Sequence, residues 1–274
     1  MINLNSLARV LLLLCLPSAS LAQGADETLA FARLLHAEGE YYRAITEYKR
    51  VLYLAPDEST MIRETAILGI GGALFSGSEY GRSAEWVHAH LTNLRAGEKR
   101  MEGFRLMCRG FLADNAGSRL LTVIHELGDS IPETRIYEGL AHANIGHWRE
   151  AATVFQSLNE NESLGPMACR FATFAQEGER AAWKSPRAAC VLGIVPGLGY
   201  WYAGHRQTAV ASLLVNALFV GATVVAFQSD QDLLGGFMSL FTVSWYAGNV
   251  YGSSLAARRY NDNLHDEIWG RFEY

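Results

Sequence analysis

The sequence predicts an all-α protein, in which a solenoid of helical hairpins is followed by a membrane-spanning helical hairpin with two or three membrane segments. Three observations lead to this prediction. Between Asp26 and Trp183, apolar residues recur at helical spacing and small residues stand at turn positions. From residue 188 to residue 257 the only formally charged residues are Arg206, Asp230 and Asp232. The chain also begins with a short apolar segment of the kind that directs export.

Residues 1–22 are predicted to be a secretory signal peptide. Arg9 precedes the apolar run VLLLLCL, and Ser20, Leu21 and Ala22 form a small-x-small cleavage pattern. The apolar run is shorter than the roughly 20 residues that a spanning helix needs. We therefore expect cleavage after Ala22, and an uncleaved membrane anchor is the alternative.

A predicted repeat region, residues 24–184, follows the signal peptide. Its segment FARLLHAEGEYYRAITEYKRVLYLAP has the pattern of a helix, a tight turn and a second helix, marked by Gly39, Tyr41, Ala44, Tyr48 and Pro56. The small Ala44 permits close helix approach, and the two tyrosines fill the groove beside it. Pro56 ends the second helix, because proline has no backbone donor and its ring clashes with the preceding turn.

The same pattern recurs in RIYEGLAHANIGHWREAATVFQSL. Here Gly139, Gly146, Trp148, Ala151 and Phe155 take the corresponding places. Both segments resemble tetratricopeptide repeats. The resemblance implies a docking module for a peptide or protein segment rather than a pocket for chemistry.

Two segments between these repeats keep the helix-turn-helix rhythm with weaker signatures. In residues 64–91, Gly71, Tyr80 and Ala84 match the first repeat in part, and residues 104–127 match it little. We expect four to five helical hairpins in total. A single hairpin cannot bury its apolar face alone, so neighbouring hairpins stack into a solenoid that offers a binding surface.

Two long uncharged stretches, separated by a short segment with Asp230 and Asp232, predict a transmembrane helical hairpin over residues 207–257. Residues 207–227 lack formal charges and span about 31 Å as a helix. That length matches the hydrocarbon core of a bilayer, which is roughly 30 Å thick. Residues 233–257 form the second stretch, and residues 258–274 follow as a polar C-terminal tail.

The segment 188–204 contains the sequence VPGLGYWYAG, in which proline and glycine interrupt an apolar run. Such interruptions are tolerated at membrane depth where neighbouring helices or water satisfy the backbone. Tyr200, Trp201 and Tyr202 suit the headgroup layer. This segment is predicted to be a broken, re-entrant piece or a short third span.

The C-terminal third resembles the membrane hairpin of a group of bacterial envelope tetratricopeptide proteins and, more distantly, the TM2-type hairpin with its P-G-x-G-x-x-Y-x-G signature. His205 and Arg206 depart from that pattern, which commonly has an acidic residue and glycine there. We expect the asparagines to hydrogen-bond between helices, and the glycines, Gly221 included, to allow close helix contact. The matching positions are Pro196, Gly197, Gly199, Tyr202, Gly204, Asn216, Trp245, Tyr246, Gly248 and Asn249, with Tyr251 and Gly252 beside them.

The topology signals conflict. With two spans, Arg206 and Arg258 lie on the same side as the repeats, which indicates a cytoplasmic repeat region. The signal peptide indicates export. A short third span over 188–204 satisfies both, so the favoured location is the bacterial inner membrane with an exported, periplasmic repeat region.

Several function classes are disfavoured. A formal net charge of −5 does not suggest a nucleic-acid partner. Cys108, Cys169 and Cys190 form neither a disulfide framework nor a zinc motif, and we expect them to be small buried residues. Ser130 and His265 match a hydrolase motif, but in the wrong structural context. No enzyme, cofactor or metal site is predicted.

The sequence thus favours a non-catalytic, membrane-tethered scaffold of the bacterial envelope. Its partner is another envelope protein or peptide segment, bound on the solenoid, and membrane lipid surrounds the hairpin. The alternative is that the hairpin itself forms a homo-oligomer, acting as a small channel or as an aid to membrane-protein insertion.

Overall fold

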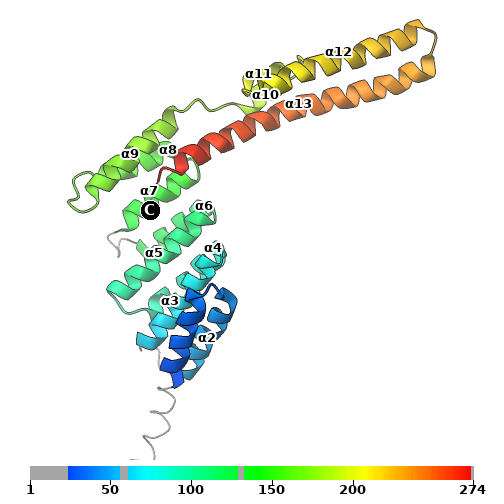
Figure 1. The fold of residues 1–274 in the computed structure, drawn as a ribbon. Helices are drawn as coiled ribbons and strands as arrows, with labels where there is room; N and C mark the ends of the chain where they lie inside the picture. The colour runs from blue at the N-terminus through cyan, green and yellow to red at the C-terminus, as the bar shows by residue number, and fades with distance from the viewer. Residues whose placement is uncertain (1–23, 56–60, 129–132, 273–274) are drawn as a thin grey trace, which may run out of the picture. The chain divides into compact units, whose positions relative to one another are not determined.

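The computed structural model describes residues 24–55, 61–128 and 133–272, and it divides into two compact units between Ala175 and Gln176. Within those ranges every regular element is a helix and none is a strand (Figure 1). The predicted all-α class is therefore confirmed. The predicted signal peptide of residues 1–22, Pro56 and Ser130 lie outside the described residues.

The first unit is a series of neighbouring helix pairs (Figure 1). In its described part, four helix-turn-helix hairpins are followed by α9, within which the unit ends. A short 3-10 helix, η1 (Leu91–Asn93), follows α4. The hairpins consist of residues 24–37 with α2 (Tyr41–Leu54), α3 (Met61–Ser76) with α4 (Tyr80–His90), α5 (Glu98–Ala113) with α6 (Gly117–Leu127), and α7 (Thr134–Asn144) with α8 (Trp148–Ser157), before α9 (Gly165–Arg180).

The four hairpins share one turn geometry. Gly39, Ser78, Asn115 and Gly146 each occupy the turn with a positive φ between 58° and 81°. In each turn the next amide N–H bonds a carbonyl five residues back, as Glu40 does to Leu35 at 2.9 Å. This is the left-handed helix ending that glycine or asparagine favours.

The core of the first unit is built from aromatic rings that pack on glycines. Tyr48 lies against Gly69 of α3, where an added Cβ would come within 2.5 Å of the tyrosine ring. Phe155 is fully buried and covers Gly139 in the same way. Helices therefore approach closely where the sequence places a glycine opposite a ring.

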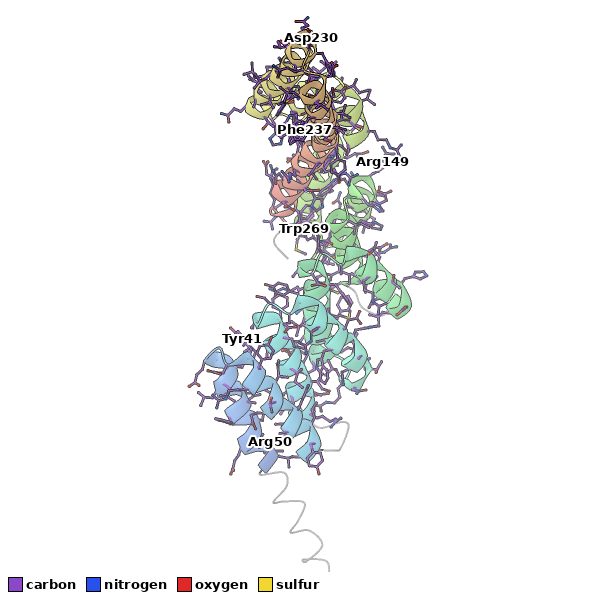
Figure 2. All side chains as sticks on the ribbon, turned by 90° about the vertical axis from the view of Figure 1, so that its right-hand side faces the viewer. Tyr41, Arg50, Arg149, Asp230, Phe237 and Trp269 are labelled. Atoms are coloured by element: carbon purple, nitrogen blue, oxygen red, sulfur yellow. The ribbon has the colours of Figure 1, made fainter. Side chains whose placement is uncertain are left out.

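The second unit consists mainly of two antiparallel helices, α12 (Arg206–Gln228) and α13 (Asp232–Trp269). They are joined by a tight turn in which Asp230 has a φ of 60°, and Asp230 marks this closed end in Figure 2. The polar residues that follow residue 257 continue α13 up to Trp269. The C-terminal segment expected as a separate tail is thus mostly part of that helix, and Arg271 after it pairs with Glu177.

Two short helices, α10 (Pro186–Leu192) and α11 (Leu198–Tyr202), pack against α13. The Asn261 side chain binds both backbone polar groups of Lys184 at 2.8 Å, and Tyr246 Oη donates to the Ile194 carbonyl at 2.6 Å. These bonds fix the proline- and glycine-rich segment to the side of the hairpin.

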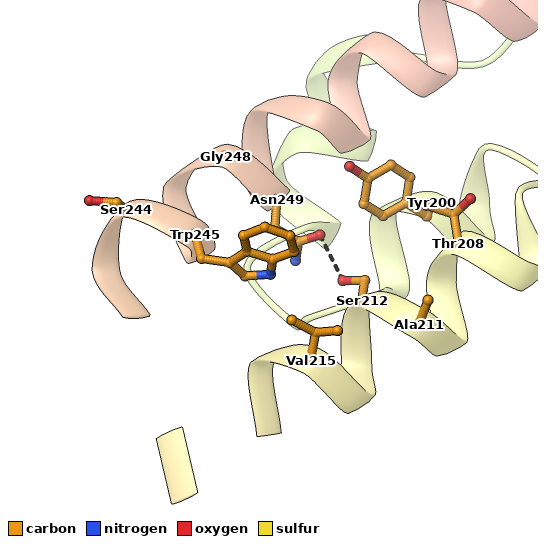
Figure 3. Close-up of a pocket in the computed structure, with 9 residues that line it drawn as sticks. All are labelled: Tyr200, Thr208, Ala211, Ser212, Val215, Ser244, Trp245, Gly248 and Asn249. Atoms are coloured by element: carbon orange, nitrogen blue, oxygen red, sulfur yellow. Dashed lines mark hydrogen bonds between the residues drawn. The ribbon is translucent and has the colours of Figure 1, made fainter. Parts of the chain in front are cut away.

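Polar side chains connect α12 and α13. Ser212 Oγ donates to Asn249 Oδ1 at 2.7 Å (Figure 3), and the hydroxyls of Thr223 and Thr242 lie 3.0 Å apart. Asn249 thus bonds between helices as expected. For Asn216 the expectation is wrong, because its amide donates to the Ser212 carbonyl of its own helix.

The glycines of the hairpin divide into two kinds. A Cβ at Gly193, Gly199 or Gly252 would collide with a neighbouring side chain or carbonyl, so these positions give the close contact that was expected. At Gly221 and Gly248 nothing lies within 4 Å of an added Cβ, so the expectation of close contact is wrong there. These two glycines face open space rather than a described helix.

The cysteines also differ from expectation. Cys108 is fully buried, as predicted, and burial raises the pKa of its thiol. Cys169 is exposed and Cys190 is partly buried. The error arises because Cys169 lies on the outer face of α9.

Candidate functional site

A groove of about 580 Å³ lies on the face formed by the first helices of the first three hairpins. Residues 24–37, α3 and α5 supply nearly all of its lining, and α2 contributes one tyrosine. Because three stacked hairpins build the groove, its shape depends on their packing. The lining residues are His36, Tyr48, Thr65, Leu68, Gly69, Gly72, Glu98, Lys99, Glu102, Arg105, Leu106 and Arg109.

The floor of the groove is low because α3 presents glycines there. Gly69 accommodates the Tyr48 ring, and a Cβ at Gly72 would lie 3.4 Å from the His36 ring. His36 Nε2 lies 3.3 Å from Ser76 Oγ, and burial lowers the pKa of the imidazole. At neutral pH His36 is therefore uncharged and offers a hydrogen-bonding group rather than a charge.

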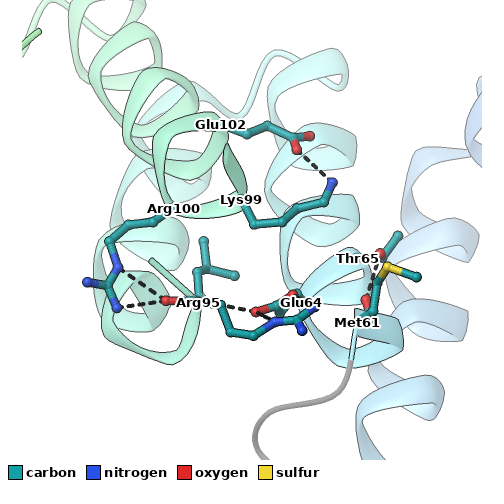
Figure 4. Close-up of polar contacts among 8 residues, drawn as sticks. Met61, Glu64, Thr65, Arg95, Lys99, Arg100 and Glu102 are labelled. Atoms are coloured by element: carbon teal, nitrogen blue, oxygen red, sulfur yellow. Dashed lines mark hydrogen bonds and ion pairs between the residues drawn. The ribbon is translucent and has the colours of Figure 1, made fainter. Parts of the chain in front are cut away.

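Side chains of both charges form the α5 wall. Lys99 Nζ bonds Glu102 at 2.8 Å (Figure 4), and Arg105 makes a bidentate pair with Glu133 at 2.5 and 2.8 Å. The Arg109 guanidinium lies 5.3 Å from the centre of the Phe75 ring. Among the described residues, no carboxylate lies within ion-pair distance of Arg109, so it can meet an acidic group of a ligand.

An ion pair between the buried Glu64 and the partly exposed Arg95 fixes the loop that leads into this wall (Figure 4). Glu64, fully buried in the first turn of α3, accepts from the backbone N–H of Arg95 at 2.7 Å and from its guanidinium twice at 2.9 Å. The hydrogen bonds from Arg95 hold the pKa of Glu64 below its usual range. Arg100 in turn donates twice to the Leu94 carbonyl. The position of α5 is thus coupled to α3.

The repeat-signature residues serve mostly to build the hairpins. Gly39 and Gly146 form turns. Tyr41 is half-buried beside His36. Of the described signature residues only Tyr48 lines the groove. Most of the described signature residues are buried between the packed helices: Ala44, Tyr48, Gly139, Trp148, Ala151 and Phe155.

Sequence reasoning missed the charged wall of the groove. Glu98, Glu102, Arg105 and Arg109 follow one another at helical spacing on α5, so they share one face. Two of these residues, Arg105 and Arg109, lie in the segment with the weakest repeat signature, and the two glutamates lie just before it. Repeat signatures consist of small and aromatic residues, so they give no signal for a charged wall.

Metal-binding groups do not assemble in the part of the chain that is described. No three His, Cys, Asp or Glu side chains there lie close enough to hold a metal ion. His265 lies 3.6 Å from Asp266, and its expected counterpart Ser130 lies outside the described residues.

The hairpin signature residues meet at the end of the second unit where α10, α11, α12 and α13 come together. Gly197 and Gly204 have φ values of +87° and +85° and begin and end the turn of α11. Tyr202 Oη accepts the Ser185 N–H at 3.0 Å. Pro196 lies in the turn before α11, and Trp245 and Tyr246 lie on α13. These residues position α10 and α11 on the hairpin.

Of the described helices, only α12 is long and apolar enough to cross a membrane, with a mean hydropathy of 2.2 over its most apolar 18 residues. Residues 233–257, expected as a second span, are less apolar, and α13 does not have the hydropathy of a membrane-spanning helix over any window of 18 residues. Both helices nevertheless carry exposed large apolar side chains, among them Leu218, Leu233 and Leu240, each at least 70% exposed. Such a surface marks an interaction with lipid or protein.

Comparison with protein-family models, with curated proteins and with solved structures finds no match for the chain. The features that bear on function are therefore the groove of the first unit and the apolar surface of the second.

Proposed function

We propose that this protein is a non-catalytic scaffold of the bacterial envelope, which binds a protein partner on its repeat unit and is held at the membrane by its C-terminal hairpin. One observation carries the proposal. A groove with side chains of both charges lies across three stacked hairpins, in the same chain as a helix that is long and apolar enough to span a bilayer.

An extended segment of another envelope protein suits the groove. The groove extends over three helices, and donors and acceptors line it together with Tyr48 and Leu68. Arg109 offers an attachment point for an acidic side chain of the partner.

The proposed membrane part consists of α12 and the apolar portion of α13. Within α10 and α11, the longer helix has 7 residues, or about 10 Å. The hydrogen bond between Ser185 and Tyr202 brings the two ends of the segment together. This geometry supports a broken, re-entrant segment rather than a third span, and hence an even number of crossings.

With two crossings, the repeat unit and the C-terminus lie on the same side of the membrane. The basic residues near the start of α12 favour the cytoplasm for that side, whereas the signal peptide favours export. We propose export to the periplasmic side of the inner membrane. The first apolar segment to be synthesised usually dominates the topology.

A photo-crosslinking amino acid tests the docking proposal in intact cells. Introduced at Glu102 in the groove, it is expected to capture one defined protein, and the capture weakens in an Arg109→Glu variant. The matched control is Thr122, an exposed residue of α6 outside the groove. Equal capture from both positions contradicts docking in the groove.

A second candidate is an oligomeric membrane hairpin that acts as a channel or an insertion aid. It is favoured by Gly221, Gly236 and Gly248, which have open space around them and so allow another helix to approach. A defined oligomer in detergent that persists without residues 24–175 supports this candidate, and a monomer removes it.

A further inference from the structure

A cavity of about 400 Å³ lies between α11, α12 and α13 in the second unit (Figure 3). Its walls are largely apolar, with Tyr200 and Trp245 as the large side chains, and Ser212 and Asn249 form a polar patch on its lining. The volume lies within the range of small-ligand pockets. The residues that line it are Tyr200, Thr208, Ala211, Ser212, Val215, Ser244, Trp245, Gly248 and Asn249.

One polar group in this cavity has an unmet hydrogen bond. Asn249 is only 7% exposed, and its Oδ1 accepts from Ser212, but its Nδ2 has no partner. Exchanging the two amide atoms would leave the oxygen without a partner instead. This nitrogen is covered by protein atoms, so the polar surface that a ligand meets directly is the patch on the cavity lining, which favours a ligand with an oxygen-containing group.

Basic side chains gather at the end of the hairpin next to the cavity. The Arg206 guanidinium lies 5.5 Å from the centre of the Trp201 ring, and its helix runs directly into Thr208 of the cavity. Lys184 Nζ lies 5.1 Å from the Tyr202 ring and 5.5 Å from the Tyr260 ring.

The basic side chains at this end have no ion-pair partner in the part of the chain that the structure describes. Among the described residues no carboxylate is paired with the side chains of Lys184, Arg187, Arg206, Arg258 or Arg259, although ion pairs occur at many other arginines. The carboxylates Asp230 and Asp232 stand at the opposite, closed end of the hairpin. Asp262, Asp266 and Glu267 follow on α13, but no described carboxylate is paired with Arg206, so this side chain can take an anion from outside the chain.

We propose that this cavity binds one acyl chain of an anionic phospholipid, with the lipid phosphate at Arg206 and the ester oxygens toward the Ser212 and Asn249 side. The inference rests on the proposed membrane insertion of the hairpin. Charge complementarity selects the occupant, since a net negative headgroup matches the unpaired basic residues and a zwitterionic one does so less well.

The full-length protein in bilayers of phosphatidylcholine tests this proposal through tryptophan fluorescence. A small fraction of phosphatidylglycerol or phosphatidylcholine with brominated chains is added, and the Trp245 signal is taken as the difference from a Trp245→Phe variant. Brominated phosphatidylglycerol is expected to quench Trp245 more strongly than brominated phosphatidylcholine at the same fraction. The Arg206→Gln variant should lower the apparent affinity for the anionic lipid about five-fold.

A pair of glycine variants locates the lipid. Gly248→Leu places a larger side chain in the cavity, and Gly221→Leu adds the same side chain elsewhere. At both positions an added Cβ has no neighbour within 4 Å. The excess quenching should disappear in Gly248→Leu and persist in Gly221→Leu. Quenching of Gly248→Leu by brominated phosphatidylcholine shows that this variant still inserts.

Each result that contradicts the proposal identifies a different step of it as wrong. Equal quenching by the two lipids overturns the anionic site while leaving membrane insertion intact. Excess quenching that survives in Gly248→Leu places the lipid outside the cavity. Disulfide crosslinking between copies that carry Gly248→Cys assigns the cavity to a second copy instead. Absence of quenching by either lipid removes the proposed membrane insertion itself.

Discussion

At the scale of single residues, the contact between Glu64 and Arg95 is the clearest case of a buried charge that organises its surroundings. Glu64 is fully buried, and its three hydrogen bonds all come from Arg95. Arg95 itself is 56% exposed, so the pair stands at the edge of the core. Loss of the arginine side chain leaves a buried carboxylate with a single partner.

We expect Arg95→Ala to lower the free energy of unfolding by about 2 kcal/mol, because hydrogen bonds to a charged group are lost. Arg82→Ala is the matched control, since Arg82 pairs with Glu79 at an exposed site and should cost less than about 1 kcal/mol. Denaturant unfolding of the full-length protein followed by circular dichroism measures both. Equal losses would show that the buried pair is not special.

The same pair predicts a dependence of stability on pH. The pKa of Glu64 is lowered in the folded protein from 4.5, so its contribution is complete above that value and is lost as the pH falls through the lowered pKa. The stability difference between the wild type and Glu64→Gln should be largest near neutral pH and shrink in acid. A difference that stays constant from neutral pH to below the lowered pKa contradicts this account.

A glycine under an aromatic ring gives a second prediction at this scale. Gly139→Ala places a methyl group within 2.5 Å of the Phe155 ring and should destabilise the protein by about 1–3 kcal/mol through overpacking. Gly72→Ala is the control, because its nearest neighbour would be 3.4 Å away and alanine favours the helix. Thermal unfolding of the two variants should shift in opposite directions or by clearly unequal amounts.

Turn residues explain why two repeats were hard to recognise. The left-handed position is glycine at Gly39 and Gly146, where the sequence pattern was clear, but serine at Ser78 and asparagine at Asn115. Asparagine tolerates a positive φ by local hydrogen bonding, and serine there is uncommon. The sequence therefore revealed the two hairpins that carry glycine and only hinted at the other two.

At the scale of elements, the sequence predicted where most helices lie, but not where α13 ends or which helix faces pack together. Apolar periodicity located the hairpins, and the uncharged stretch after Arg206 located α12. The sequence could not show that the polar residues beyond position 257 continue α13, because a change of polarity does not end a helix. Nor could it show the groove wall on α5, since tertiary stacking brings that wall opposite His36.

The attachment of α10 and α11 to α13 yields a prediction for an element. Asn261→Ala removes both hydrogen bonds to the Lys184 backbone, so the segment 186–204 should exchange its amide hydrogens faster. Asn263→Ala, an exposed change on the same helix, serves as the control. Hydrogen exchange read by mass spectrometry checks this, and unchanged exchange in Asn261→Ala would mean that other contacts hold the segment.

At the scale of the whole molecule, the protein joins a repeat unit with a buried core to a hairpin whose surface is apolar. Leu218 and Leu240 are each 70% exposed, about as much as the charged side chains of Arg43 and Arg82 in the repeat unit. The proposed insertion of the hairpin in lipid accounts for this surface, because extended exposed apolar surface marks a contact with lipid or protein. With two crossings, the repeat unit and the closed turn of the hairpin must lie on opposite sides of the membrane.

Labelling with a membrane-impermeant maleimide tests this arrangement most directly. The native Cys169 is exposed on α9, and Asp230→Cys places a thiol at the closed turn of the hairpin. Each is to be the only cysteine in its variant, in cells whose outer membrane has been opened. The account predicts that Cys169 is labelled at once and that the thiol at position 230 is labelled only after the inner membrane is permeabilised. The reverse pattern, or recovery of the intact protein in the soluble fraction without detergent, would contradict it.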